Sequence, residues 1–237
     1  EQQRTQFIMH VTHELRAPVT GAKSLLRVLL NNILGDIPPK QRDILQRLEI
    51  RMDSLLSLIR DLLALAETKS QMDVAKTDSV ELQPIVKSTI EKFRAQADEK
   101  DLYLEFINHT APSIRVIATE NGLGHILDNI VGNAVKYTPE HGAVSVEIID
   151  HAPSVLVVVK DNGMGIPSDD LNRLGDEFFR ASNARKSGVE GTGLGLTSGK
   201  LLIYQVGGLL SIQDEEAKGT TVTIALKLDD GITQNVN

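Results

Sequence analysis

A histidine followed by a glutamate is the first pair in the chain that could do chemistry. His13 and Glu14 lie in residues 7–19, FIMHVTHELRAPV, where the apolar residues have helical spacing. At about 100° per residue, His13 lies about 200° from Val11 and points away from the apolar stripe. A neutral imidazole is a competent nucleophile, and a neighbouring carboxylate can orient the ring and accept its proton. Exposed His–Glu pairs are also common on helices without any function, and Ala17 excludes a zinc HExxH site.

Two amides, a cation and an aromatic ring form the second group. Asn129, Asn133, Lys136 and Tyr137 are spaced by four, three and one residues, which places them on one face of a helix. Apolar residues occupy the opposite face of the same helix: Ile126, Leu127, Ile130, Val131 and Ala134. Amide oxygens suit Mg²⁺, a lysine can contact a phosphate, and a tyrosine ring can pack on a base. The same pattern is also that of an ordinary solvent face of an amphipathic helix.

Two glycine-rich segments form the third and fourth groups. DNGMG at 161–165 follows an apolar strand pattern, and GTGLGL at 191–196 opens a helical pattern. Glycines before a helix allow close approach to the backbone, and N–H groups at a helix N-terminus attract phosphate. A polar loop precedes Gly191, which argues against a Rossmann site, and the sequence contains no GxxxxGK[ST] P-loop. Each segment alone is weak evidence.

The residues before about position 70 predict two long helices. Apolar residues three, four or seven apart run over 11–33 and again over 45–62, and LGDIPP at 34–39 predicts the turn between them. Pro18 cannot donate to the carbonyl of Glu14, so we expect a bend just past the His–Glu pair. Two helices cannot enclose this much leucine and isoleucine. The hairpin therefore packs against the rest of the chain or, as we favour, dimerises into a four-helix bundle.

The remainder of the chain has a mixed α/β pattern after a polar linker over 67–76. The pattern predicts helices over 82–97, 120–137 and 193–205, and strands over 102–107, 114–117, 144–149, 155–159, 209–213 and 220–226. The predicted strands over 144–149 and 155–159 flank a turn at 150–153, which indicates a hairpin. The long polar stretch at 163–192 is typical of a lid or a disordered loop, and 231–237 is typical of a frayed tail.

Composition excludes several classes of protein. The length of 237 residues suggests one or two domains, and the net charge of −7 argues against binding of nucleic acid. No apolar run approaches about 18 residues, so no membrane span is expected. The absence of cysteine rules out disulfides and thiolate metal sites. Four histidines are scattered and do not indicate a metal site: His109, His125, His141 and His151. The chain begins at Glu1 in a helical pattern and is interpreted as a piece of a longer protein.

The order of these groups closely resembles that of the sensor histidine kinases of bacterial two-component signalling, over nearly the whole chain. The resemblance rests on 7–19 as the H-box, 129–137 as the N-box, 161–165 as the G1 box, 191–196 as the G2 box, 178–180 (FFR) as the end of the F-box and 218–221 as a closing hairpin. The five boxes, taken together in their order along the chain, are far more specific than any one of them.

The resemblance implies an α+β multidomain chain, in which a helical hairpin dimerises into a four-helix bundle and is followed by an α/β sandwich, the Bergerat ATP-binding fold. The expected divisions are 1–68 for the dimerisation and histidine phosphotransfer hairpin, 69–78 for a linker, 79–230 for the ATP-binding catalytic domain and 231–237 for a tail. The implied partners are a second copy of the chain and a response-regulator receiver protein, with no nucleic acid and no direct membrane contact. The expected location is the cytoplasm, as a fragment of a sensor whose own membrane attachment the sequence leaves open.

The resemblance also assigns roles. His13 accepts the γ-phosphate of ATP, Glu14 accepts the proton, and the phosphate then passes to an aspartate of the receiver. Asp161 binds the adenine amino group, while Asn133, with Asn129, holds Mg²⁺ between the phosphates. The other implied nucleotide-binding residues are Lys136, Tyr137, Gly163, Gly165, Arg180, Gly191, Thr192, Gly193, Leu194, Gly195, Leu196 and Thr221.

Three positions depart from the family pattern. Ala17 stands where relatives that dephosphorylate their partner carry Thr or Asn, which predicts weak phosphatase activity. Gly175 stands where the F-box often has a phenylalanine, which predicts a less well anchored lid. Gly199 costs its helix about 1 kcal/mol relative to alanine, without a functional reason in the sequence.

Three rival interpretations share some of these motifs. An ATPase related to the chaperones and topoisomerases would need a base to activate water, and the His–Glu hairpin argues against it. A protein Ser/Thr kinase of the anti-sigma-factor type would lack the H-box. A non-enzymatic dimeric scaffold would have lost reactive residues that are present here. His10 lies one turn from His13, but only His13 is followed by Glu-Leu-Arg-x-Pro.

Overall fold

The computed structural model describes most of the chain. The described residues are 2–70, 78–111, 113–189, 191–215 and 218–229. Two of the expected segments therefore lie wholly or mostly outside the described residues: the tail at 231–237 and the linker at 69–78. Within the described part, no helix is long and apolar enough to cross a membrane.

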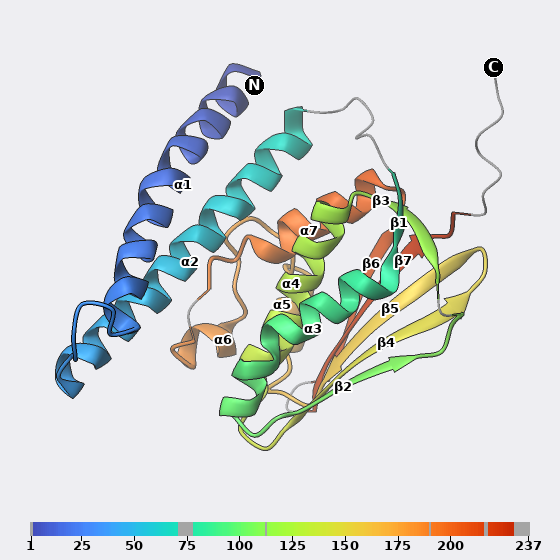
Figure 1. Cartoon of the computed structure of the whole chain (residues 1–237). Coiled ribbons are helices and arrows are strands. Elements are labelled where there is room, and N and C mark those ends of the chain that lie inside the picture. Colours follow the sequence, from blue (N-terminus) through green and yellow to red (C-terminus); the bar gives the residue numbers. More distant parts are fainter. Residues whose placement is uncertain (1, 71–77, 112, 190, 216–217, 230–237) are drawn as a thin grey trace.

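The N-terminal part is an antiparallel hairpin of α1 (Gln2–Leu30) and α2 (Pro39–Ser70), which confirms the two predicted helices (Figure 1). Proline suits the first position of a helix, where its missing N–H is not needed. The helix α1 runs through Pro18 as one element, and α2 continues to Ser70, so the expected start of the linker at 69 is helical.

Ion pairs set the register between the two helices of the hairpin. Arg27 Nε lies 3.1 Å from Glu49 Oε1, and Lys23 pairs with Asp53 one turn further on. Many apolar side chains of the hairpin nevertheless stay exposed in the single chain: Leu15, Leu25, Leu29, Ile33, Leu34, Ile44, Leu48, Ile50 and Leu55. Packing within the chain therefore covers only part of the two apolar stripes.

The C-terminal part is built on a five-stranded sheet with the order β2-β4-β5-β7-β6. Its strands are β2 (Tyr103–Asn108), β4 (Ala143–His151), β5 (Ser154–Asp161), β6 (Leu209–Glu215) and β7 (Gly219–Lys227). β2 and β4 are parallel and the other neighbours are antiparallel, including the predicted β4–β5 hairpin.

Three helices cover one face of this sheet: α3 (Leu82–Glu99), α4 (Glu120–Tyr137) and α7 (Gly195–Gln205) (Figure 1). Valines alternate along β4 and β5, so that every second side chain points to the same face. Val146 and Val157 are fully buried there against the apolar stripe of α4. This two-layer arrangement confirms the predicted α/β sandwich.

Three short elements were not expected from the sequence. β1 (Asp78–Glu81) pairs with β3 (Arg115–Ala118) in a separate two-stranded sheet, and α5 (Ser168–Leu171) and α6 (Ser182–Lys186) lie within the long polar stretch. Their sequences, DSVE, SDDL and SNARK, each contain a single apolar residue, so they show no hydrophobic period from which they could be predicted.

Candidate functional site

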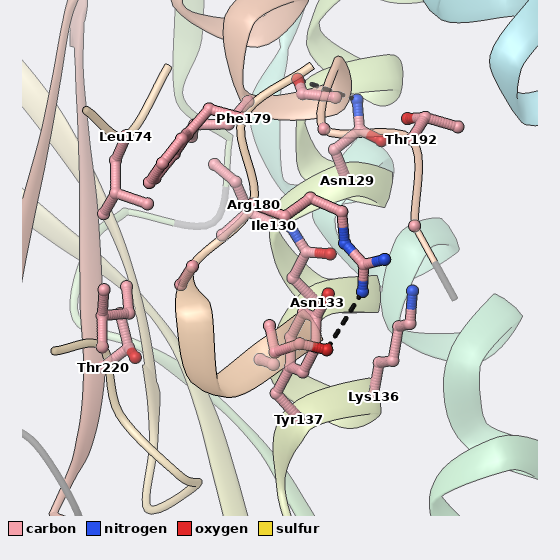
Figure 2. A pocket seen from close by; sticks show the side chains of 18 of the residues that line it. Asn129, Ile130, Asn133, Lys136, Tyr137, Leu174, Phe179, Arg180, Thr192 and Thr220 are labelled. Carbon is pink, nitrogen blue, oxygen red and sulfur yellow. Dashed lines mark hydrogen bonds between the residues drawn. The ribbon is translucent and has the colours of Figure 1, made fainter. Parts of the chain in front are cut away.

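A cavity of about 910 Å³ lies between α4, α2 and the long polar stretch that follows β5, residues 163–192, which we call the lid. This volume is in the range of small-molecule sites. Twelve of the residues singled out in the sequence line it: Asn129, Asn133, Lys136, Tyr137, Asp161, Gly165, Arg180, Gly191, Thr192, Gly193, Gly195 and Leu196. Motifs that are far apart in sequence thus share one cavity (Figure 2).

Asp161 is oriented by two backbone donors at the end of β5. Its Oδ1 accepts hydrogen bonds from Gly163 N at 2.8 Å and from Thr220 N at 3.3 Å. Gly163 is buried behind the carboxylate, where a Cβ atom would lie 2.8 Å from the carbonyl oxygen of Tyr137. The glycine therefore allows the chain to pass close to the end of α4, and that approach fixes the carboxylate at the cavity wall.

Three of the predicted nucleotide-binding residues do not line the cavity themselves. Gly163 acts behind Asp161, and Leu194 is fully buried at the start of α7. Thr221 pairs with Lys160 in the β5–β7 ladder, whereas its neighbour Thr220 lines the cavity. Side chains alternate along a strand, so an error of one position selects the opposite face.

Both residues of the His–Glu pair belong to α1. Glu14 is exposed, and it is not among the residues that line the cavity. The side chain of His13 lies outside the part of the chain that the structure describes.

Two cations meet at one end of the cavity. Figure 2 shows the charged ends of Lys136 and Arg180 close together, beside Asn133. Burial, and then the positive charge of Arg180, lower the pKa of Lys136 to about 8. Arg180 Nη2 donates to the carbonyl oxygens of Ala184, at 3.2 Å, and of Val189. Because like charges are held together here, a bound anion would relieve their repulsion.

The two asparagines on α4 both line the cavity. Asn129 Nδ2 donates to Gly195 O at 3.3 Å and lies 3.2 Å from His125 Nε2. Hard amide oxygens suit Mg²⁺, which usually keeps waters and binds phosphates at the same time. Among the described residues, no group of three or more His, Cys, Asp or Glu side chains could hold a metal ion by itself. A metal at this site would therefore depend on the asparagines and on the oxygens of an anionic ligand.

Two positions at which the sequence departs from the family pattern, Gly175 and Gly199, lie in the lid and in the helix that follows it. Gly175 adopts φ +97°, and Lys200 Nζ donates to the adjacent carbonyl of Leu174 at 2.6 Å. Gly199 is buried, and a Cβ atom there would lie 2.9 Å from the Ile126 side chain. The lysine thus supplies an anchor at the lid segment, and the glycine allows α7 to pack closely on α4.

One wall of the cavity was missed by the sequence analysis. It comes from α2 and consists of Ile50, Arg51, Ser54, Leu55, Ser57, Leu58 and Asp61. Apart from Leu55, these residues lie outside the apolar pattern of positions three or four apart over 45–62, so that pattern did not indicate them.

Comparison with known proteins matches two family models to this chain. Residues 3–71 match the His Kinase A (phospho-acceptor) domain, and residues 118–230 match the histidine kinase-, DNA gyrase B- and HSP90-like ATPase. The full-length crystal structure of ShkA in complex with AMPPNP superposes with a TM-score of 0.72 at 26% identity, covering 94% of this chain and 46% of that one.

Curated relatives extend over almost the entire chain. Sensor histidine kinase WalK of Bacillus subtilis (strain 168) is 32% identical over 231 residues, which is 95% of this chain and 37% of WalK. The phosphate regulon sensor protein PhoR of Pseudomonas aeruginosa is 30% identical over 223 residues, which is 94% of this chain and 50% of PhoR. The chain thus spans half or less of the length of these two relatives.

Proposed function

This chain belongs to the sensor histidine kinase family, and we propose that it is an ATP-dependent autokinase. It transfers the γ-phosphate of ATP to His13 and then to an aspartate of a response-regulator receiver domain. The observation that carries this proposal is the cavity that brings Asp161 together with Asn133 and Lys136, from two separate motifs.

The cavity has a polar end for a base and a cationic end for phosphates. Asp161 accepts a hydrogen bond from the adenine amino group, and Tyr137 packs beside the base. Lys136 and Arg180 contact the phosphates, as do the N–H groups at the start of α7. When bound, Mg²⁺ would be held by Asn133 and Asn129 and would neutralise charge between the phosphates.

The chemical step is an in-line displacement. One ring nitrogen of His13 bonds to the γ-phosphorus while the bond to the β,γ-bridging oxygen breaks, and ADP leaves. Glu14 holds the proton on the other ring nitrogen and accepts it as charge develops. Phosphoryl transfer of this kind depends mainly on positioning and on charge neutralisation.

The active unit is a homodimer. Each chain consists of the dimerisation and phosphotransfer hairpin (1–68), a linker (69–78), the catalytic domain (79–230) and a tail (231–237). The apolar side chains that stay exposed along both helices of the hairpin support dimerisation, because a four-helix bundle would bury them. We place this part of the protein in the cytoplasm, where ATP and a receiver protein would be available.

Labelling with γ-³²P-ATP and Mg²⁺ tests the proposal. An autokinase yields protein-bound label that is labile to acid and stable to alkali, whereas α-³²P-ATP yields none. ATP hydrolysis to free phosphate without protein-bound label would favour the ATPase alternative, and label stable to acid would favour a Ser/Thr kinase.

Nucleotide affinity is expected to depend on pH through Lys136. Its pKa of about 8 lies below the ordinary 10.5, and phosphates would raise it by favouring the charged form. Affinity should therefore be constant below pH 8 and fall above it, by up to about tenfold per pH unit. Calorimetric titration with ATP and Mg²⁺ at pH 7, 8 and 9 measures this. Lys136→Met should bind weakly at every pH without this dependence, and an equally steep fall in that variant would contradict the assignment.

The phosphatase activity of the chain toward a phosphorylated receiver is expected to be weak because Ala17 offers no group to orient water. Ala17→Thr should raise the rate of dephosphorylation in the presence of ADP by about tenfold. Ala17→Val is the matched control, since valine has the shape of threonine without its hydroxyl. Equal rates in the two variants would show that position 17 does not position the water.

A further inference from the structure

A buried carboxylate joins the hairpin to the catalytic domain. Asp61 on α2 is only 1% exposed. Its Oδ2 accepts a hydrogen bond from Thr192 Oγ1 at 3.1 Å, and its Oδ1 lies 3.3 Å from His125 Nε2 on α4. Burial of a carboxylate is costly unless it is paired. Asp61 shares a face of α2 with Ser54, Ser57 and Leu58, and this face lines the cavity.

The contacts of Asp61 reach the groups expected to hold the nucleotide. His125 Nε2 also lies 3.2 Å from Asn129 Nδ2 and 3.4 Å from Ser198 Oγ on α7. Thr192 belongs to the segment that ends the lid, and its Oγ1 accepts from Leu194 N at 3.2 Å. Asp61 is therefore one histidine away from a proposed Mg²⁺ ligand and in direct contact with the end of the lid.

The register of the hairpin places Asp61 near the level of the phosphoacceptor. From the pair Arg27–Glu49 to the pair Lys23–Asp53, α1 moves back four residues while α2 moves forward four. Eight further residues in the same register bring Asp61 opposite Leu15. Leu15 lies two residues from His13, or about 3 Å along the helix axis.

We propose that Asp61 is a positioning residue for the autokinase step, an inference that rests on the proposed function. Its hydrogen bond to Thr192, together with its 3.3 Å approach to His125, fixes where the phosphate end of the cavity docks along α2, at the level of His13. Apolar contacts alone allow sliding along a helix, whereas a buried hydrogen-bonded carboxylate specifies one register. Precise docking matters because a misplacement of about 1 Å can cost on the order of 100-fold in rate.

The surroundings of Asp61 indicate that hydrogen bonding, rather than charge alone, fixes the docking position. Oδ1 of Asp61 has no hydrogen-bond partner among the described residues, although His125 Nε2 is near. An asparagine at position 61 could still accept from Thr192 Oγ1 and could donate to a neutral His125. The isosteric variant should therefore recover most of the function that an alanine loses.

The test compares three variants of the whole chain in single-turnover autophosphorylation at saturating ATP. Asp61→Ala should slow labelling by about tenfold or more while the Kd for ATP stays within about threefold of wild type. Asp61→Asn should stay within about threefold of the wild-type rate. Asp53→Asn is the matched control, an acid on the same helix that pairs with Lys23 away from the cavity, and its rate should not change.

Four kinetic outcomes would overturn the inference. An unchanged rate in Asp61→Ala would show that the contact is incidental, and a faster rate would show that it holds the kinase off. Equal losses of rate and of ATP affinity would place Asp61 in nucleotide binding rather than in docking. A rate in Asp61→Asn as slow as in Asp61→Ala would refute the hydrogen-bond explanation.

Hydrogen exchange reads the same contact without any activity. In the nucleotide-free chain, the amides of 191–196 should exchange faster in Asp61→Ala than in wild type or in Asp53→Asn. If wild type acquires no label, the proposed function fails, and exchange still decides whether Asp61 docks the catalytic domain. Unchanged exchange in Asp61→Ala would overturn the docking contact even in an active kinase.

Discussion

His13→Gln is expected to abolish acid-labile labelling by γ-³²P-ATP, by about 10³-fold or more, while leaving ATP binding intact. Glutamine keeps a polar side chain of similar length but has no nucleophilic nitrogen, so no phosphoramidate can form. The nucleotide cavity is built from α4, the end of β5, the lid, α7 and α2, so a change on α1 should not alter the Kd for ATP. Autoradiography after acid and alkali treatment, together with a calorimetric titration, measures both quantities.

His10→Gln is the matched control for this prediction. His10 is exposed on α1, one helical turn before His13, so it tests whether any histidine on this segment can accept the phosphate. Its label should equal that of wild type. Label that survives in His13→Gln and disappears in His10→Gln would move the phosphoacceptor by one turn.

The parts of the fold with a strong local period could be predicted from the sequence. The apolar residues of α2 repeat every three or four positions over several turns, and the valines of β4 and β5 tend to alternate along each strand. The structure confirms the predicted helix and both strands. β1 and the lid helices α5 and α6 lack such a repeat, because each contains a single apolar residue. Their positions depend on tertiary contacts, such as the pairing of β1 with β3.

The candidate site shows the same division between local pattern and tertiary contact. Asn129, Asn133 and Asp161 stood in recognisable motifs, and they line one cavity. Thr220 was missed because only the strand register decides which of two adjacent threonines faces inward. Asp61 was missed because its role arises from docking between segments 131 residues apart, between which no sequence period can exist.

Asp161→Asn is expected to weaken binding of ATP by about 10- to 100-fold. Gly163 N and Thr220 N hold Oδ1, so an asparagine would keep its single oxygen on these donors and place its amide N–H₂ at the position of Oδ2. A donor would then face the donating amino group of adenine, which replaces a charge-assisted hydrogen bond with an unpaired contact. Because the backbone bonds are kept, the free energy of unfolding should change little.

Calorimetric titration of ATP, and of GTP for comparison, checks this prediction. GTP carries an oxygen where adenine carries its amino group, so Asp161→Asn should narrow the preference for ATP over GTP as well as weaken ATP binding. Asp150→Asn, an exposed acid near the far end of β4, is the matched control for loss of one negative charge. If both variants weakened ATP binding equally, net charge would explain the effect and Asp161 would not read the base. If ATP and GTP weakened in parallel in Asp161→Asn alone, the carboxylate would shape the cavity without contacting the amino group.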